Sequence, residues 1–275
     1  MILGFHGSVR PGYLFALREA ERLGCAALQI LPYRRHHEPT PAELAEFRDA
    51  WRASSVQRVI VHARYLPYLS ANRGPRRDSS IEHLRRELRL AAALGGEALI
   101  VHVGAYSSEG DADDGMDLFC ESLKLGWESV PAAERVPIYV ENVPGGGRRL
   151  GGSLGELRAV LDRSPATGAC LDTAHAFAYG YDLASGMDSF LDTADAVLGA
   201  AIRVIHLNDT QAALGSHREN HCVWGEGFLA RSLSAFAKPR WDAIPAIVEA
   251  PPGTEEACLT YVKAAFGVRL VSGVD

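Results

Sequence analysis

Eight short runs of β-branched and other apolar residues recur along the chain, and their spacing constrains the fold more than any other feature. Most of them precede a segment with helical periodicity, such as residues 79–95 and 152–163. Continuous apolar runs, as opposed to alternating ones, are typical of strands buried on both faces of a parallel sheet. The runs span residues 2–5, 26–30, 58–62, 98–102, 137–141, 169–172, 203–207 and 245–249.

This repeated strand–helix pattern predicts an α/β fold, a (β/α)8 barrel in which parallel strands form a ring inside a layer of helices. With 275 residues, 47% of them hydrophobic, the chain is long enough for one such barrel. No linker, low-complexity tract or internal duplication interrupts the sequence. We therefore expect residues 1–275 to form a single TIM-barrel domain.

The sequence also indicates where the protein resides. Its first residues, MILGFHGSVR, lack a basic stretch leading into a long apolar segment, and no apolar run approaches the roughly 18 residues of a membrane helix. The five cysteines are scattered and form no C-x-x-C pair, which is typical of reduced thiols. We expect a soluble, cytoplasmic protein that needs neither a membrane nor an obligate protein partner.

The last six apolar runs each close at or beside an imidazole or a carboxylate. Barrel enzymes assemble their active sites at the carboxyl ends of the strands. A single histidine in such a place is usually a hydrogen-bonded core residue, but six residues in phase indicate a functional site. They are His62, His102, Glu141, Asp172, His206 and Glu249.

These residue types point to bound metal ions. Imidazole and carboxylate ligands without cysteine suit zinc, and also manganese or iron. Burying several bare carboxylates together is costly, and divalent cations remove that cost. One zinc ion takes about four ligands, so six strand ends together with His175 exceed the needs of one ion. Glu219 and His221, two residues apart in a polar loop, either add ligands or form an exposed pair.

Several longer stretches resemble the endonuclease IV (family 2) apurinic/apyrimidinic endonucleases, which belong to the xylose isomerase-like barrels. The similarity extends from GFHGS (4–8) to VEAPP (248–252). Its most specific segments are VHARYL (61–66), VENVPGGG (140–147), LDTAHAFAYGYDL (171–183) and HLNDTQAALGSHRENHCVWGEG (206–227).

The resemblance implies an enzyme that uses three zinc ions, with manganese or iron possible at some sites, to cut duplex DNA on the 5′ side of an abasic sugar. The products would be a 3′-hydroxyl and a 5′-deoxyribose phosphate. Glu141 and Glu249 would be the catalytic carboxylates. The implied ligands are His62, His102 and Glu141 for the first ion, Glu141, Asp172, His206 and Glu249 for the second, and His175, Glu219 and His221 for the third.

The resemblance also implies how DNA is held. Tyr65 and Leu66 would enter the duplex at the lesion, and Arg34 or Arg35 would contact DNA from a loop. The net charge of −6 alone argues against a nucleic-acid partner. Three divalent ions would offset it, and arginine-rich loops at 32–37, 70–80 and 145–150 follow strands on the active face.

The chain departs from the family pattern at several positions. Glu219 lies in ENH where the family has DRH, Gly146 replaces a common glutamine, and Arg64 replaces a smaller residue. The segment 31–41 aligns poorly with the corresponding DNA-contacting loop of the family.

Two other functions remain open from the sequence. A sugar isomerase or epimerase would need one ion on Glu141, Asp172, His206 and Glu249, which leaves the other histidines without a role. A non-catalytic binder of damaged DNA would have a third site weakened at Glu219.

Overall fold

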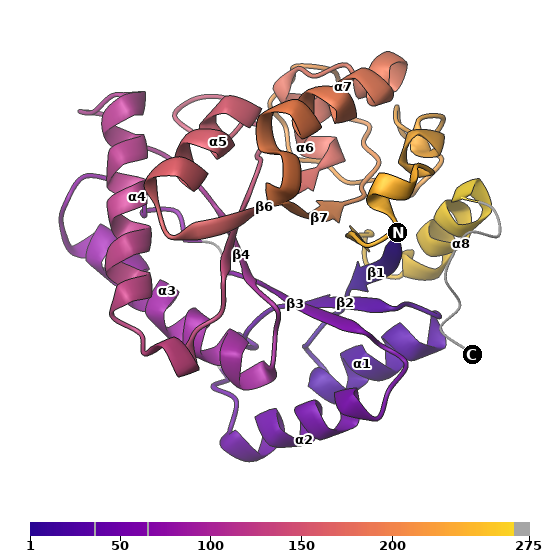
Figure 1. Ribbon diagram of the computed structural model, residues 1–275, viewed down its shortest axis with the longest axis horizontal. Coiled ribbons are helices and arrows are strands. Elements are labelled where there is room, and N and C mark those ends of the chain that lie inside the picture. Colours follow the sequence, from indigo (N-terminus) through magenta and orange to yellow (C-terminus); the bar gives the residue numbers. More distant parts are fainter. Residues whose placement is uncertain (36, 65, 267–275) are drawn as a thin grey trace.

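Eight parallel strands pair in chain order and close into a barrel within residues 1–35, 37–64 and 66–266, which the computed structural model describes. The first strand pairs with both the second and the eighth, and this closes the ring (Figure 1). The barrel predicted from the sequence is thus confirmed. The strands are β1 (Ile2–His6), β2 (Ala27–Ile30), β3 (Arg58–His62), β4 (Leu99–His102), β5 (Ile138–Glu141), β6 (Ala166–Asp172), β7 (Ile202–His206) and β8 (Pro245–Val248).

Helices surround the ring on its outside (Figure 1). Two of them, α6 (Thr173–Tyr179) and α7 (Leu183–Leu198), follow β6. A long loop and short 3-10 helices at Leu233–Phe236 and Pro239–Trp241 follow β7. The α-helices are α1 (Tyr13–Arg22), α2 (Pro41–Arg52), α3 (Pro75–Leu94), α4 (Ala112–Glu128), α5 (Leu154–Arg163), α6 (Thr173–Tyr179), α7 (Leu183–Leu198) and α8 (Glu255–Phe266). Two further 3-10 helices lie at Ala132–Glu134 and Gly199–Ala201.

Local sequence signals set the starts of several helices. Capping boxes begin α2 and α5, where Thr40 pairs with Glu43 and Ser153 pairs with Glu156. Each box satisfies backbone N–H groups that the first helical turn leaves free. Helix α3 starts with Pro75 and ends before Gly95, whose φ of 79° suits a residue without a side chain.

The apolar residues form two clusters. The larger one lies between the barrel and its helices, whereas the smaller one fills the barrel interior with residues that lie in, or just before, seven of the strands. The interior cluster comprises Ala27, Ile60, Ala98, Ile100, Tyr139, Cys170, Val204 and Ile247. Since side chains alternate along a strand, residues two positions further on must also point inward, one layer nearer the carboxyl end.

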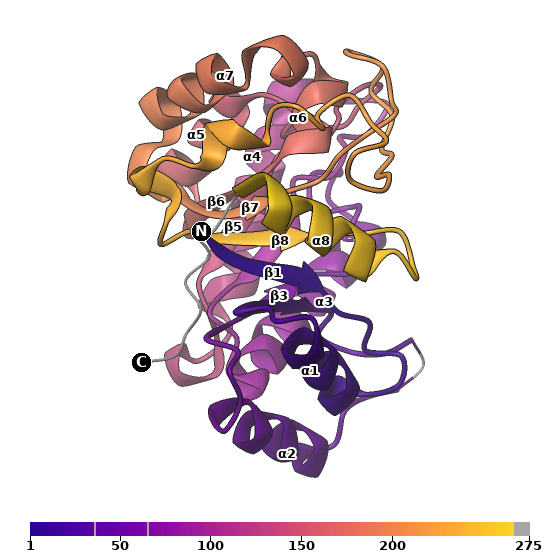
Figure 2. The same ribbon diagram turned by 90° about the vertical axis from the view of Figure 1, so that its right-hand side faces the viewer.

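The loops after the strands gather at one end of the barrel. In Figure 2 the arrowheads of β1 and β8 point to the right, toward the side where the long loop after β7 lies. Among the described residues, no helix has the length and apolar character required to cross a bilayer.

Candidate metal centre

One polar layer lies directly above the interior apolar cluster, and every strand contributes to it. Six members are the residues predicted from the sequence, and β1 and β2 add two more. Pairing places some of them side by side, since His102 is in register with Glu141 and Asp172 with His206. The layer comprises His6, Gln29, His62, His102, Glu141, Asp172, His206 and Glu249.

Glu141 lies at the centre of this layer and is fully buried. Its Oε2 lies 2.9 Å from Nε2 of His62 and 3.0 Å from Nε2 of His102. Its Oε1 lies 2.9 Å from Nδ1 of His206. The carboxylate thus faces imidazoles on both sides, which suits a ligand shared by two ions.

Gln29 connects three other members of the layer and is itself fully buried. Its Nε2 donates to Oε1 of Glu249 at 2.8 Å and lies 2.9 Å from Nδ1 of His6. Since a carboxylate only accepts, this contact fixes the amide orientation, and Oε1 of Gln29 lies 2.8 Å from Nε2 of His206. Gln29 therefore orients the carboxylate of Glu249 and the imidazole of His206.

Asp172 has two roles because β6 ends where α6 begins. It caps the helix, with Oδ1 accepting the N–H of His175 at 2.7 Å. The short turn brings the imidazole of His175 beside the Asp172 carboxylate, with 3.8 Å between Nδ1 and Oδ2. His221 reaches the same carboxylate from the loop after β7, with Nε2 3.6 Å from Oδ2.

Three of the imidazoles are presented as metal ligands usually are, with one ring nitrogen donating to a carbonyl oxygen. These contacts are His62 Nδ1 to Ala63 O at 2.7 Å, His175 Nδ1 to Asn142 O at 2.9 Å and His206 Nε2 to the side-chain oxygen of Gln29 at 2.8 Å. The opposite nitrogens of His62 and His206 face Glu141. Nε2 of His175 is buried and has no hydrogen-bond partner among the described residues. A buried, unpaired imidazole nitrogen of this kind suits a metal ligand.

The electrostatics agree with this interpretation. Burial raises the pKa of Glu141, but His206 and His102 outweigh it and hold that pKa well below its usual value. Burial lowers the pKa of His175, yet Asp172 and Glu141 outweigh it and raise the pKa to about 10. Because protons and cations compete for these nitrogens, metal binding must release protons.

Several overlapping groups of ligand atoms lie close enough together to hold an ion, with all atoms of a group within 4.8 Å of one another. Two of them are the sets expected for the first and second ions, and a third joins His175 and His221 to Asp172 in place of the expected Glu219. These are His62, His102 and Glu141; Glu141, Asp172, His206 and Glu249; and Asp172, His175 and His221. The residues present therefore fit more than one divalent cation.

Glu219 belongs to none of these groups among the described residues. It is exposed, and it lines a cavity of about 220 Å³ together with His62, His102 and Leu66. Leu66 is only 8% exposed and packs into the outer apolar cluster, so its side chain does not stand free at the rim. Tyr65 lies outside the described residues.

The two arginines expected to contact DNA differ in their surroundings. The Arg34 guanidinium binds Glu43 at the start of α2, with 2.8 Å between Nη2 and Oε1, so its charge is paired. Arg35 is exposed. Arg64 stacks on Tyr33, with 5.2 Å from its guanidinium carbon to the ring centroid, and thereby joins the loops after β2 and β3.

The long loop after β7 is anchored by Asp209. Oδ1 accepts the N–H groups of Thr210 and Leu229 at 2.8 and 2.9 Å, and Oδ2 accepts those of Gly225 and Gly227 at 3.1 and 3.0 Å. The backbone oxygen of Asp209 accepts the N–H of Cys222 at 3.1 Å. These bonds hold the segment that carries His221.

Gly146 is explained by its contact with the same loop. Its φ is 84°, and a Cβ atom there would lie 2.6 Å from Cβ of His217. A glutamine at this position would be strained and would displace His217. The loop after β5 thus packs closely on the loop after β7.

Four polar residues of the site were not assigned a role from the sequence. Gln29 stood inside an apolar run, and His6 follows the first run by one residue. Asn142 joins β5 to β6 by accepting the N–H of Asp172 at 2.7 Å, and Asn208 donates to Oδ2 of Asp172 at 2.6 Å. Each asparagine lies just after a predicted ligand, Asn142 after Glu141 and Asn208 after His206. Nothing else in the sequence indicated a role for either of them.

Comparison with known proteins agrees with this geometry. The model of the xylose isomerase-like TIM barrel family matches residues 17–261. Endonuclease 4 of Thermus thermophilus is 34% identical over 92% of this chain and 93% of its own. Probable endonuclease 4 of Solibacter usitatus is 32% identical over 98% of both chains. A crystal structure of endonuclease IV from Thermus thermophilus superposes with a TM-score of 0.82 at 32% identity and covers 97% of both chains.

The barrel and its ring of imidazoles and carboxylates define an enzyme of the xylose isomerase-like class. Within that class, the chain belongs to the endonuclease IV family, as the resemblance predicted.

Proposed function

We propose that the protein hydrolyses the phosphodiester bond on the 5′ side of an abasic site in duplex DNA, and leaves a 3′-hydroxyl and a 5′-deoxyribose phosphate. The proposal rests on family membership together with one observation. Three overlapping groups of ligand atoms converge on Glu141 and Asp172 at the mouth of the barrel. Carboxylates shared in this way can hold several ions close enough together to act on one phosphodiester.

The ions we propose are zinc, because the donors are imidazoles and carboxylates in small groups. His62, His102 and Glu141 would hold one, and Glu141, Asp172, His206 and Glu249 a second. Asp172, His175 and His221 lie together for a third, to which Glu219 would add its carboxylate. Bound zinc supplies a water of lowered pKa near neutral pH and positive charge for the phosphate oxygens.

The protein's own residues would fix the geometry. Gln29 and Asn208 both donate to Glu249, at 2.8 and 3.2 Å, so this carboxylate cannot rotate freely. Glu141 is held between imidazoles from β3, β4 and β7. Held in this way, Glu141 and Glu249 would present a fixed negative pair to the ions, and reaction would need little reorganisation.

For DNA, we propose that the loops after β2 and β3 supply the contacts. Tyr65 and Leu66 would enter the stack where a base is missing, since unstacking costs least there. Because Leu66 is packed in this structure, its entry would require the loop after β3 to shift. Arg35, which is exposed, is better placed for a phosphate than Arg34, which is paired with Glu43.

A sugar isomerase would need only the group of Glu141, Asp172, His206 and Glu249. That alternative leaves the orphaned nitrogen of His175 and the convergence of His62 and His102 on Glu141 without a role. The surplus of ligands therefore favours the nuclease.

Metal analysis and an incision assay test the proposal together. The protein is loaded with zinc, its metal content per chain is measured, and it is incubated with an end-labelled duplex carrying one tetrahydrofuran abasic analogue. We expect about three ions per chain and a nick on the 5′ side of the analogue. His102→Ala should abolish nicking, whereas His83→Ala, on the exposed face of α3, should not. One ion per chain without nicking would refute the nuclease.

A further inference from the structure

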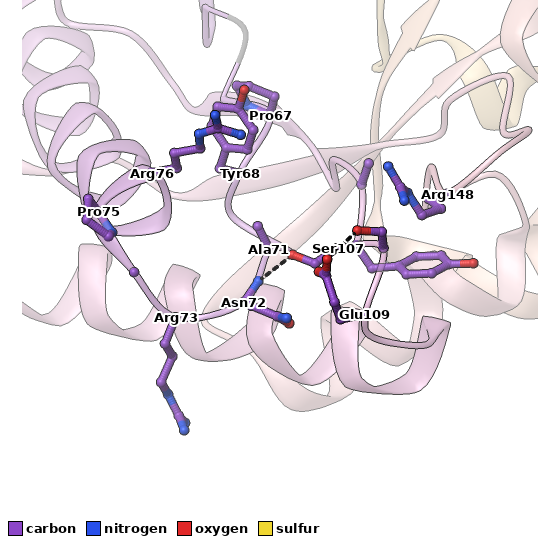
Figure 3. A pocket seen from close by; sticks show the side chains of 14 residues that line it. Pro67, Tyr68, Ala71, Asn72, Arg73, Pro75, Arg76, Ser107, Glu109 and Arg148 are labelled. Atoms are coloured by element: carbon purple, nitrogen blue, oxygen red, sulfur yellow. Dashed lines mark hydrogen bonds between the residues drawn. The ribbon is translucent and has the colours of Figure 1, made fainter.

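A second cavity lies next to the candidate metal centre, between the loops that follow β3, β4 and β5. Its volume is about 710 Å³. The two cavities are lined by neighbouring residues of the loop after β3. Leu66 lines the small cavity beside His62 and His102, and the next residue, Pro67, lines the larger cavity. Figure 3 shows Tyr68 and Arg76 on one side and Arg148 on the other, with Ala71 and Ser107 between them.

The cavity is positively charged in a chain whose net charge is −6. Its lining contains Arg73, Arg76 and Arg148 against one acidic residue, Glu109. Arg73 is bound to Glu121 of α4 at 2.9 Å. Arg76 and Arg148 are exposed, and within the described part of the chain neither guanidinium forms a hydrogen bond or an ion pair. Two guanidinium groups on opposite walls, neither hydrogen-bonded to a carboxylate, suit a phosphate between them.

An aromatic ring is available in the same place. Tyr68 is 39% exposed, which is unusual for so large a side chain in this structure. The guanidinium carbon of Arg76 lies 5.6 Å from the centroid of its ring. An exposed ring combined with arginines is typical of surfaces that bind unpaired nucleic acid, where bases stack and phosphates pair with cations.

The size of the cavity distinguishes a single strand from a duplex. Its volume is in the range of small-molecule sites, roughly 300–1,000 Å³. That space admits a nucleotide, whereas a duplex would remain outside and meet only the tips of the arginines. A duplex backbone also offers no exposed base face to Tyr68.

We propose that this cavity binds an unpaired nucleotide of the DNA substrate, with its base against Tyr68 and its phosphate between Arg76 and Arg148. The inference rests on the proposed function, because it assigns a substrate feature to the same DNA-cleaving face. It extends the substrate class to DNA in which a single-stranded segment adjoins the lesion.

Binding of a fluorescein-labelled short oligothymidylate to the zinc-loaded protein, followed by anisotropy, tests the inference. Tyr68→Ala and the double variant Arg76→Gln/Arg148→Gln should each bind about tenfold more weakly than the wild type. Tyr68→Phe should keep the affinity, because it keeps the ring. The control Arg52→Gln/Arg163→Gln removes the same charge from the last turns of α2 and α5, at the opposite end of the barrel, and should bind like the wild type.

Three results would overturn the inference: equal affinity of the cavity variants and the wild type, weakening by Tyr68→Phe as large as by Tyr68→Ala, or displacement of the probe by intact duplex as readily as by unlabelled oligothymidylate. Incision of a continuous abasic duplex tests the proposed function separately from nucleotide binding in the cavity. The control Arg52→Gln/Arg163→Gln should incise that duplex at the wild-type rate. A wild type that fails to incise it refutes the nuclease, whatever the oligothymidylate result.

Discussion

His62 and His102 direct their Nε2 atoms at the same oxygen of one carboxylate, Oε2 of Glu141, at 2.9 and 3.0 Å. The two rings meet edge to face, with 5.2 Å between their centroids. The other oxygen of Glu141 lies 2.9 Å from Nδ1 of His206. The Glu141 carboxylate thus links three imidazoles, one each from β3, β4 and β7.

Glu141→Gln tests this relationship. The amide keeps the shape of the side chain but removes the negative charge, so we expect incision of the abasic duplex to fall by at least about 100-fold and metal content to drop. Single-turnover incision and elemental analysis measure the two effects. Glu97→Gln is the matched control, since Glu97 pairs with Arg58 at the start of β3, away from the site. Near-normal turnover of Glu141→Gln would rule out its role as a shared ligand.

Gln29→Leu tests the amide that orients His206 and Glu249. Leucine fills a similar space but offers neither hydrogen bond, so zinc affinity should fall about 10- to 100-fold. Competition with a chromogenic chelator gives the affinity. Gln57→Leu, at an exposed position before β3, serves as the control. Unchanged zinc retention by Gln29→Leu would show that the hydrogen bonds do not tune the site.

Glu219 is tested by two substitutions, because it lies near the site without joining a ligand group in this structure. If it binds the third ion, Glu219→Ala should lose about one ion per chain, whereas Glu219→Asp should keep it. Metal content measures both, and Glu226→Ala, exposed in the same loop, is the control. Equal metal content in all variants would remove Glu219 from the site.

The sequence predicts the site residues well where the alternation of side chains along a strand determines which way they point. The interior residues Ile60, Ile100 and Tyr139 lie two positions before His62, His102 and Glu141, so the barrel geometry alone turns all of them inward. The same rule applies to Gln29, two positions after Ala27, but an uncharged amide inside an apolar run gave no chemical signal.

The positions of side chains in the loops are less predictable, because contacts with residues distant in sequence determine them. Arg34, one of two arginines expected to contact DNA, pairs with Glu43, and Leu66, expected to enter the duplex, packs into the outer cluster. Two residues two positions apart, such as Glu219 and His221, have their side chains on the same side only where the backbone is extended as in a strand. Residues 217–220 form no strand, so the spacing alone did not determine where Glu219 lies.

Glu87 of α3 makes stability depend on pH. It is fully buried, and burial raises the pKa of its carboxyl group from 4.5 to about 7. Between these values the folded protein holds a proton that the unfolded chain has lost, so the free energy of unfolding falls as pH rises from 4.5 to 7 and then levels off.

Glu87→Gln should remove this dependence. Relative to the wild type, the variant should gain up to about 3 kcal/mol between pH 5 and pH 8. Urea denaturation at several pH values measures the difference, and Glu46→Gln, exposed on α2, is the control. Parallel pH profiles of the Glu87→Gln variant and the wild type would contradict the assignment.

The four N–H groups that Asp209 collects close the base of the loop after β7 independently of its tip. The turn formed by residues 213–218 is held by other partners, because the N–H groups of Gly215 and His217 donate to the carbonyl oxygens of Phe177 and Ala178, and Nδ1 of His217 donates to that of Pro144. Any redesign of the loop after β7 must therefore preserve two independent sets of anchors, the Asp209 bonds at its base and the His217 bonds at its tip.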